Sequence, residues 1–247
     1  MNKSLTANGE PGRGSESEDE VMTLAEIAQY LKVSQKTIIR MAQSGEIPAA
    51  KVSNQWRFLS SMIDDWLVGK MQSATNADLV DIISMASEVT PISRLISVER
   101  IVMNMEPGSK SVILTQLVKK LKESRPSIDA GEYLVRLIER EEMVSTAIGP
   151  GVALPHPRDP RQTKDVAPCI VLGICPHGTE FESLDGKPTY VFALCCSNSE
   201  IVHLRLMAKV TLLLRQKQIV RQLRAAETAN DVMRYVLNSD SELTTQF

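Results

Sequence analysis

A stretch without a single lysine or arginine, Met71–Thr90, divides the sequence into two unlike parts. Before it, basic residues outnumber acidic ones from Met22 to Lys70. After it, from Pro91, longer helical patterns alternate with apolar runs of strand length. A chain of 247 residues is long enough for one large domain or two smaller ones. We therefore expect a small domain at 21–70, a linker with a short helix at 71–90, and one compact domain at 91–240.

Both ends of the chain are polar. Residues 1–20 contain five acidic and two basic residues together with Gly, Pro and Ser. Such a composition cannot bury apolar surface, so we expect a disordered acidic tail there. Residues 241–247 are expected to fray, as chain ends commonly do.

The composition is that of an ordinary globular chain, with 43% hydrophobic and 23% charged residues. No apolar run approaches the roughly 20 residues of a membrane-spanning helix, and the N-terminus lacks the regions of a signal peptide. The cysteines show no CxxC spacing, which argues against a zinc site or a secreted disulfide framework. We expect a bacterial, cytoplasmic protein with no membrane partner, metal or cofactor. The net charge of -2 does not exclude nucleic-acid binding, because the charge is unevenly distributed.

Two short helices joined by a tight turn are predicted at Thr23–Leu31 and Ser34–Ser44. Thr23 followed by Glu26 is the signature of a capping box, and Ser34 is a favourable N-cap for the second helix. Polar and basic residues occupy the first turns of that second helix. This is a helix-turn-helix pattern, in which the second helix enters the major groove of DNA.

A hairpin and a third helix follow the helix pair. Two short β-prone runs, Ile47–Val52 and Gln55–Phe58, predict two strands around a two-residue turn. An amphipathic helix at Met62–Val68 can then close a small core. We expect Trp56 and Trp66 to pack in that core rather than to stack on bases.

The segment LAEIAQYLKVSQKTIIRMAQSGEIPAAKVSNQWRFLSSMIDDWL resembles the excisionase and MerR-type winged helix-turn-helix family, including its Gly-x-Ile-Pro and Trp-Arg landmarks. The resemblance implies DNA binding, and the small local excess of positive charge favours a homodimer on DNA. The alternative is a small interaction domain with a solvated basic helix. The residues that the resemblance places against the groove or the backbone are Ser34, Gln35, Lys36, Thr37, Arg40, Lys51, Asn54 and Arg57.

The chain from Pro91 onward predicts an α/β domain, because two hydrophobic periods alternate along it. Ser109 and Lys110 begin one predicted helix, and Asp129 with Glu132 forms a capping box that opens the next. The predicted helices are 109–121, 130–141, 201–214, 218–225 and 230–237, and the predicted strands are 146–155, 169–175 and 190–196. We expect a central mixed sheet flanked by helices.

The chemistry of this domain concentrates in STAIGPGVALPHPR, residues 145–158. His156 stands between two prolines at the end of a predicted strand. Imidazole is nucleophilic near neutral pH, so it can accept a phosphoryl group and pass it on. Such a site needs nearby cations, and the small residues Gly149 and Gly151 would let a phosphate approach.

The segments IEREEMVSTAIGPGVALPHPR, HLRLMAKVTLLL and IVRQLRAAETANDV resemble the fructose/mannitol-type (type-2) enzyme IIA domain of the phosphoenolpyruvate:sugar phosphotransferase system, and its nitrogen-regulatory branch in particular. The resemblance implies that His156 accepts phosphate from a histidine-containing phosphocarrier protein. It also implies that Arg140 binds phosphate and that His203 is the second histidine of the pocket. Arg158 matches a position that is usually basic in the family.

Three positions depart from the family pattern. Pro157 replaces a glycine after the active histidine, and Pro150 replaces an Asn between the two glycines. Tyr190 replaces a residue that is commonly acidic. These changes could slow phosphorylation or narrow the choice of donor. His177 is expected in a loop after a strand, not as a metal ligand.

These patterns together predict a regulator in which phosphorylation of His156 changes DNA binding or partner contacts. One alternative is a phosphocarrier that passes phosphate to a sugar permease. Another is a DNA-binding or protein-interaction module that has lost phosphotransfer, and Pro150 and Pro157 favour it.

Overall fold

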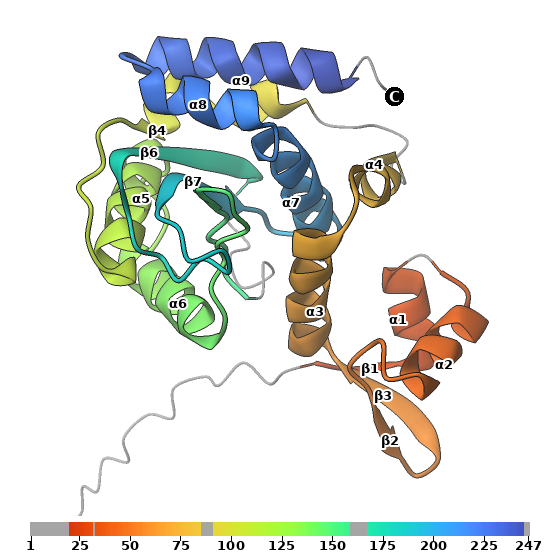
Figure 1. The fold of residues 1–247 in the computed structure, drawn as a ribbon. Coiled ribbons are helices and arrows are strands. Elements are labelled where there is room, and N and C mark those ends of the chain that lie inside the picture. Colours follow the sequence, from red (N-terminus) through yellow and green to blue (C-terminus); the bar gives the residue numbers. More distant parts are fainter. Residues whose placement is uncertain (1–19, 32, 85–90, 159–166, 245–247) are drawn as a thin grey trace, which may run out of the picture. The chain divides into compact units, whose positions relative to one another are not determined.

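The computed structural model describes residues 20–31, 33–84, 91–158 and 167–244. The chain forms two compact units, Met1–Ile63 and Asp64–Phe247, and the ribbon in Figure 1 shows the elements of each. All but the last residue of the expected acidic tail lies outside the described residues.

The first unit is a three-stranded antiparallel sheet with two short helices and the start of a third. The strand order is β1-β3-β2, so the last strand in the sequence is central. The elements are β1 Val21–Thr23, α1 Leu24–Tyr30, α2 Gln35–Gln43, β2 Ala50–Val52, β3 Gln55–Leu59 and α3 Ser60–Ser73, which continues into the second unit.

Local hydrogen bonds begin the two helices where the sequence predicts. The Thr23 amide donates to a carboxylate oxygen of Glu26 (2.7 Å), and the Glu26 amide donates to the Thr23 hydroxyl (3.4 Å), which completes the capping box. The Ser34 hydroxyl accepts from the Thr37 amide at 3.1 Å. The hairpin turn at Ser53 and Asn54 has φ of 46° and 64°, as a type I′ turn requires.

The core of the first unit is filled by Ile27, Ile38, Phe58 and other apolar side chains. The expectation that both tryptophans pack in this core is not met, since Trp56 and Trp66 are each only half-buried and Trp66 belongs to the second unit. Phe58 fills the core from the same face of β3, and Trp56 lies nearer the exposed hairpin turn. The ammonium group of Lys51 lies 5.8 Å from the centre of the Trp56 ring.

The second unit is built on a mixed four-stranded sheet in the order β4-β6-β7-β5. The central pair β6 and β7 is antiparallel, and each edge strand runs parallel to its neighbour. The elements are α4 Asn76–Ser84, the 3-10 turns η1 Ile92–Arg94 and η2 Val98–Arg100, β4 Ile101–Val102, α5 Lys110–Ser124, α6 Ala130–Met143, β5 Val152–Ala153, β6 Cys169–Thr179, β7 Thr189–Cys196, α7 Glu200–Leu214, α8 Lys217–Ala225 and α9 Ala229–Thr244.

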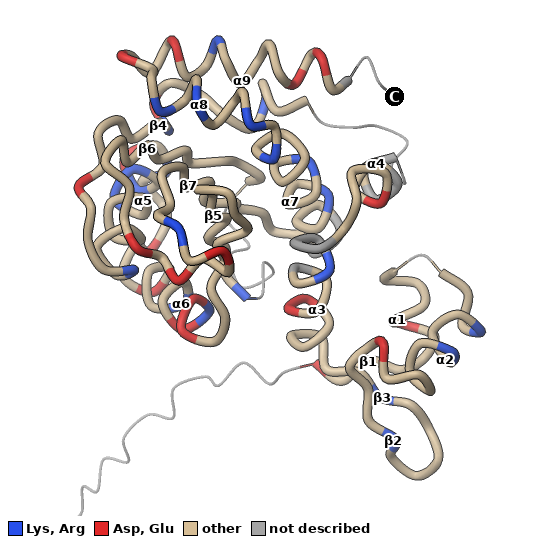
Figure 2. The backbone as a smooth tube through the Cα atoms, viewed as in Figure 1, with Lys and Arg blue, Asp and Glu red and all other residues tan. Residues whose placement is uncertain are grey.

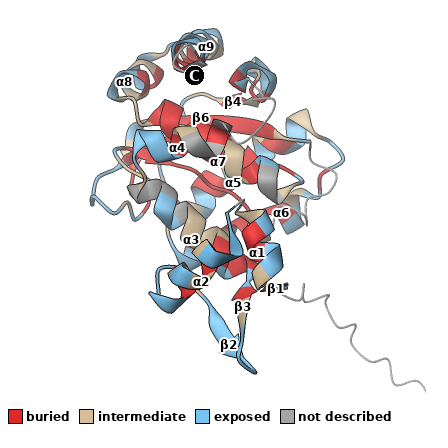
Figure 3. Cartoon of the chain, turned by 90° about the vertical axis from the view of Figure 1, so that its right-hand side faces the viewer, coloured by how far each residue is buried: buried red, intermediate tan, exposed pale blue. Residues whose placement is uncertain are grey.

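Helices cover both faces of this sheet, as expected for the α/β class (Figure 1). α5 and α6 pack on one face, and α4, α7, α8 and α9 share the core on the other. Cys195 belongs to the second of these cores and Cys196 to the first, which confirms that the two adjacent cysteines point to opposite faces. Figure 3 shows the buried residues concentrated along the central strands.

Two strand predictions need correction. Of the strand expected over 146–155, only β5 and an isolated bridge between Ala147 and Ala153 form, because the glycines at 149 and 151 turn the backbone with φ of 57° and 78°. His177 lies within β6 rather than in a loop after it, since β6 continues past Cys175 to Thr179.

The expected linker contains a helix that belongs to the second unit. α4 begins at a cap in which Thr75 accepts from the Asp78 amide at 3.2 Å, and it buries Leu79 and Ile83 in the α7-side core. These two apolar residues lie four positions apart and so share one face of the helix. That face explains why α4 packs against the second unit.

The C-terminal helix also extends further than expected. α9 reaches Thr244, with Leu243 buried, so fraying at 241–247 is not observed in its described part; residues 245–247 lie outside the description. The Asp240 carboxylate forms a buried ion pair with Lys209 at 3.1 Å and accepts from the Ile92 amide at 2.9 Å. Within the described ranges, no helix combines the length and the apolar character needed to span a bilayer.

Candidate functional site

His156 lies shortly after β5, and hydrogen bonds hold both the backbone before it and its ring. The Pro155 carbonyl accepts from the Cys195 amide at 3.0 Å, and the His156 side chain is buried. Its Nδ1 lies 2.7 Å from the Leu154 carbonyl oxygen. Because a carbonyl can only accept, Nδ1 carries the proton and Nε2 keeps the lone pair. The nucleophilic nitrogen of His156 is therefore Nε2.

His203 lies in the first turns of α7 beside His156. The ring centres are 5.2 Å apart and the rings are tilted by 47°. His203 is 9% exposed, and neither of its ring nitrogens has a hydrogen-bond partner among the described residues. A buried donor and acceptor without partners is costly, which marks this side chain as one held for a ligand or a reaction.

Arg140 is the positively charged residue that acts on both histidines. It lies in the last turn of α6, its side chain is 2% exposed, and it donates from Nη1 to the Val144 carbonyl at 2.8 Å. Burial, and then the positive charge of Arg140, lower the pKa of His156 well below its usual value and the pKa of His203 to about 4. Both histidines are therefore neutral near pH 7. The structure thus brings together Arg140, His156 and His203, which lie far apart in the sequence.

Asp65 of α3 faces the same arginine, within the second unit. Its Oδ1 lies 3.1 Å from Nε of Arg140, and its Oδ2 lies 4.0 Å from Nε of Arg158. Sequence reasoning missed Asp65, because it was assigned to the DNA-binding segment and no local pattern links it to position 140. The carboxylate and the two arginines form one charged cluster.

Glu141 is a second site residue that sequence reasoning missed. Its buried carboxylate accepts from the Thr146 amide (2.9 Å) and hydroxyl (2.6 Å), and burial raises the pKa of Glu141. The Thr146 carbonyl in turn accepts from the Leu154 amide at 3.0 Å, and the Leu154 carbonyl holds His156. Glu141 therefore fixes the backbone that orients His156. The signal available in the sequence was only that an acidic residue directly follows Arg140.

Gly149 and Gly151 lie ahead of β5, whereas His156 follows it. A Cβ on Gly149 would lie 3.5 Å from Asp185, and one on Gly151 would lie 3.0 Å from Tyr190. The positive φ angles explain why glycine stands at both positions. Their contact with a phosphate stays a prediction.

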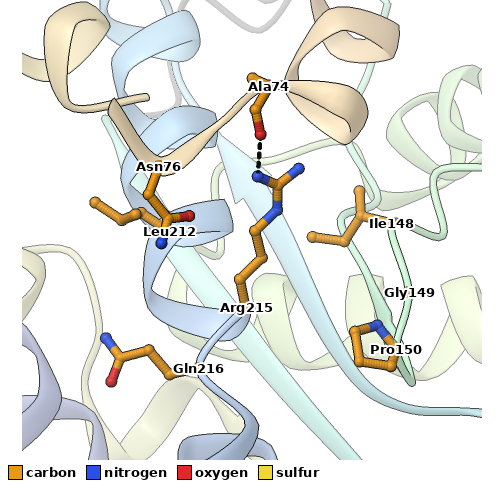
Figure 4. Close-up of a pocket in the computed structure, with 8 residues that line it drawn as sticks. All are labelled: Ala74, Asn76, Ile148, Gly149, Pro150, Leu212, Arg215 and Gln216. Carbon is orange, nitrogen blue, oxygen red and sulfur yellow. Dashed lines mark hydrogen bonds between the residues drawn. The ribbon is translucent and has the colours of Figure 1, made fainter. Parts of the chain in front are cut away.

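A cavity of about 430 Å³ opens beside this glycine turn (Figure 4). Arg215 extends into it and donates to the Ala74 carbonyl at 2.6 Å. The lining residues are Ala74, Asn76, Ile148, Gly149, Pro150, Leu212, Arg215 and Gln216, so neither His156 nor His203 contributes to it.

The residues predicted to contact DNA lie at the start of α2, along α2 and on the β2–β3 hairpin of the first unit, where Figure 2 marks lysine and arginine positions along the backbone. Most of them are exposed, namely Ser34, Gln35, Lys36, Arg40, Lys51 and Asn54. Ser34 also caps α2 and bonds to the Thr37 hydroxyl at 2.9 Å. The Arg57 guanidinium is half-buried and donates to the Gln55 side chain (2.6 Å) and the Trp56 carbonyl (3.0 Å).

The second unit is an α/β domain with a buried histidine pair, and comparison with known proteins gives its family. The family model described as "Phosphoenolpyruvate-dependent sugar phosphotransferase system, EIIA 2" matches residues 94–239, more than half of the chain. The chain therefore belongs to this family. A second family model, a helix-turn-helix domain, matches residues 21–70.

Individual relatives agree with this assignment. A nitrogen regulatory protein of Bradyrhizobium diazoefficiens is 31% identical over 147 residues, covering 58% of this chain and 92% of the relative. The PTS system fructose-specific EIIABC component of Bacillus subtilis is 28% identical over 151 residues, but the match spans 60% of this chain and only 23% of that relative. The crystal structure of nitrogen regulatory protein IIA-Ntr from Neisseria meningitidis superposes with a TM-score of 0.52 at 27% identity, over 59% of this chain and 98% of that one. These comparisons confirm the predicted family resemblance and the α/β fold.

Proposed function

We propose that this protein is a phosphotransferase-linked regulator, in which His156 accepts a phosphoryl group from a histidine-containing phosphocarrier protein and the helix-turn-helix unit binds DNA. The single observation that carries the proposal is the His156–His203 pair beside the buried Arg140. A neutral imidazole with a fixed tautomer, next to a fixed cation, is what a phosphoryl acceptor requires.

The transfer follows from the tautomer of His156. The Nε2 lone pair forms a bond to the phosphorus of the donor's phosphohistidine, and the P–N bond of the donor breaks with its electron pair returning to the donor's imidazole. The proton stays on Nδ1 throughout and keeps its hydrogen bond to the Leu154 carbonyl. Because burial keeps His156 unprotonated near neutral pH, its lone pair is available at the pH of a cell.

Charge on the moving phosphoryl group is balanced by side chains in this proposal. Proline at 155 and at 157 has no N–H, so the residues flanking His156 offer no backbone donor. Arg140 and Arg158 supply the positive charge instead, and His203 offers a ring N–H to the phosphoryl oxygens. A phosphoryl group carries about -1.5 to -2 at pH 7, which suits two guanidinium groups.

Regulation rather than transport is supported by the attached helix-turn-helix domain and by the relatives named nitrogen regulatory proteins. Exposed residues of α2, Lys36 and Arg40 among them, are available for a groove or for phosphates. Phosphorylation of His156 would change the affinity of the chain for DNA or for a protein partner.

A labelling experiment tests the acceptor. The full-length protein is incubated with phosphoenolpyruvate, enzyme I and the histidine phosphocarrier, and acid-labile phosphate is counted. One phosphate per chain is expected on the wild type and none on His156→Ala. His177→Ala is the matched control, because it removes the one other histidine outside the pair and lies exposed on β6. Undiminished labelling of His156→Ala would refute the assignment.

A DNA-binding experiment tests the coupling. Duplexes selected from a random-sequence library by the full-length protein are titrated with phosphorylated and unphosphorylated wild type. The affinity is expected to differ between the two forms and to stay unchanged for His156→Ala under the same conditions. Equal affinities of both wild-type forms would contradict a phosphate-controlled regulator.

A further inference from the structure

The guanidinium of Arg140 is deeply buried, and it forms an ion pair with a carboxylate of α3. The Arg140 side chain is 2% exposed, and the Asp65 side chain that pairs with it is 24% exposed. A buried guanidinium without an anion is strongly unfavourable, because desolvation removes the water that would otherwise solvate its charge. Asp65 provides that anion in the unphosphorylated protein.

The same carboxylate spans the two arginines that would serve a phosphoryl group. One oxygen of Asp65 lies 3.1 Å from Arg140 and the other lies 4.0 Å from Arg158. Asp65 therefore pairs with the same two cations that the proposed phosphoryl group on His156 would need.

We infer that Asp65 is an internal anion of the phosphate site, and that a phosphoryl group on His156 displaces it from Arg140. The inference rests on the proposed function and deepens it. A carboxylate and a phosphoryl group within a few ångströms repel each other, and the group with the larger charge gains more from the two arginines. Phosphorylation thus converts the Arg140–Asp65 pair into an Arg140–phosphoryl pair.

Because Asp65 lies near the start of α3, its release from Arg140 would also affect that helix. α3 begins at Ser60, directly after β3 of the hairpin, and its Ile63 is fully buried in the first unit. Asp65 follows two residues later in the same helix and is anchored in the second unit. Release of Asp65 removes an anchor of α3 next to the point where the helix leaves the DNA-binding unit. Asp65 is thus a positioning residue that links the state of His156 to α3.

The test compares Asp65→Asn with Asp64→Asn in the full-length protein. Both variants remove one negative charge from the same stretch of α3, but only the first removes the partner of Arg140. Initial rates of phosphorylation by phosphoenolpyruvate, enzyme I and the phosphocarrier are measured together with amide hydrogen exchange of residues 64–73. A merely structural defect would slow labelling, so a faster rate is diagnostic.

The expected results are specific. Asp65→Asn is labelled about threefold to fivefold faster than wild type, in line with the modest strength of a partly exposed ion pair, and Asp64→Asn is labelled at the wild-type rate. Amide exchange in 64–73 is about tenfold faster in unphosphorylated Asp65→Asn and in phosphorylated wild type than in unphosphorylated wild type.

Each other outcome decides between the two proposals. Normal labelling with unchanged exchange in phosphorylated wild type overturns the displacement of Asp65 and leaves the acceptor assignment standing. Equal labelling rates for wild type and Asp65→Asn overturn the competition for Arg140. No labelling of either protein overturns the proposed acceptor function and the displacement together, whereas labelling of Asp65→Asn alone supports the competition in its strongest form.

Discussion

The two candidate sites of this molecule are built in opposite ways. The DNA-binding candidates are mostly exposed side chains of one helix and one hairpin, close together in the sequence and supported by a small core. The histidine site collects buried side chains from α6, α7 and the segment after β5, together with the half-buried Asp65 of α3. An exposed site can be changed with little effect on stability, whereas a buried polar site links stability, protonation and chemistry.

The buried histidine site is energetically unfavourable for folding in two respects. Its histidines are held neutral by burial and by Arg140, and His203 has no hydrogen-bond partner among the described residues. Changes at the buried site should therefore be larger than changes at the exposed site, and three measurements test that contrast.

The largest effect is expected for Arg140→Ala. Loss of the buried cation should slow phosphorylation of His156 by about 10²–10³-fold, because charge on the transferring group loses its fixed counter-charge. The initial rate of labelling measures the effect. Arg136→Ala, one turn earlier on α6 where Arg136 pairs with Glu132, is the control and should stay within twofold of wild type. Equal losses in both variants would show that α6 is merely destabilised.

A medium effect is expected for the pH dependence of stability. The folded pKa of His203 is about 4 and the unfolded value is near 6.5, so the unfolded state binds more protons between these values. The stabilisation is fully present above about pH 6.5 and is lost as the pH falls toward 4. Between pH 7 and pH 5 the second unit should lose about 2 kcal/mol through His203 alone.

Urea unfolding at each pH, followed by circular dichroism, measures this loss. His203→Gln should reduce the pH dependence over this range, because glutamine does not titrate, while the part that comes from His156 should remain. His177→Gln removes an exposed histidine of β6 and is the matched control. A slope unchanged by His203→Gln would mean that this histidine is not held neutral in the fold.

The smallest effect is expected at the exposed site. Arg40→Ala should weaken DNA binding about tenfold and reduce the salt dependence of log K by about 1, since one phosphate contact is lost. Fluorescence anisotropy over a series of salt concentrations measures both. Stability should change by less than about 0.5 kcal/mol. Lys119→Ala, an exposed change on α5, is the control; an equal loss there would indicate non-specific attraction.

The same contrast explains how much could be predicted from the sequence. Helix caps and turns act over three or four residues, so Thr23, Ser34, Ser109 and Asp129 located four helix starts correctly. The mixed sheet between helices followed from the change of hydrophobic period. The family resemblance then identified residues that the structure brings together, His156 and His203 foremost.

Other features depend on contacts between distant segments and could not be predicted from local patterns. The sequence alone predicts Asp65 to be a surface residue of a third helix, and only the structure shows its ion pair with Arg140. Leu79 and Ile83 lie in a stretch without basic residues, and only their burial against α7 makes that stretch part of the second unit. The strand predicted over 146–155 is reduced to β5 because two glycines before it have positive φ. How much such glycines shorten a strand depends on the turn that they form.

The cysteines of the central strands have a practical consequence. All four are buried and unbridged on β6 and β7, and the sequence has none before Cys169. A buried thiol reacts with a thiol reagent only when the structure around it opens. The rate of thiol modification therefore measures how often the second unit opens. It does not respond to events confined to the first unit, which contains no cysteine. Comparing that rate with and without phosphate on His156 would show whether phosphorylation changes the opening of the second unit, without adding any label to the chain.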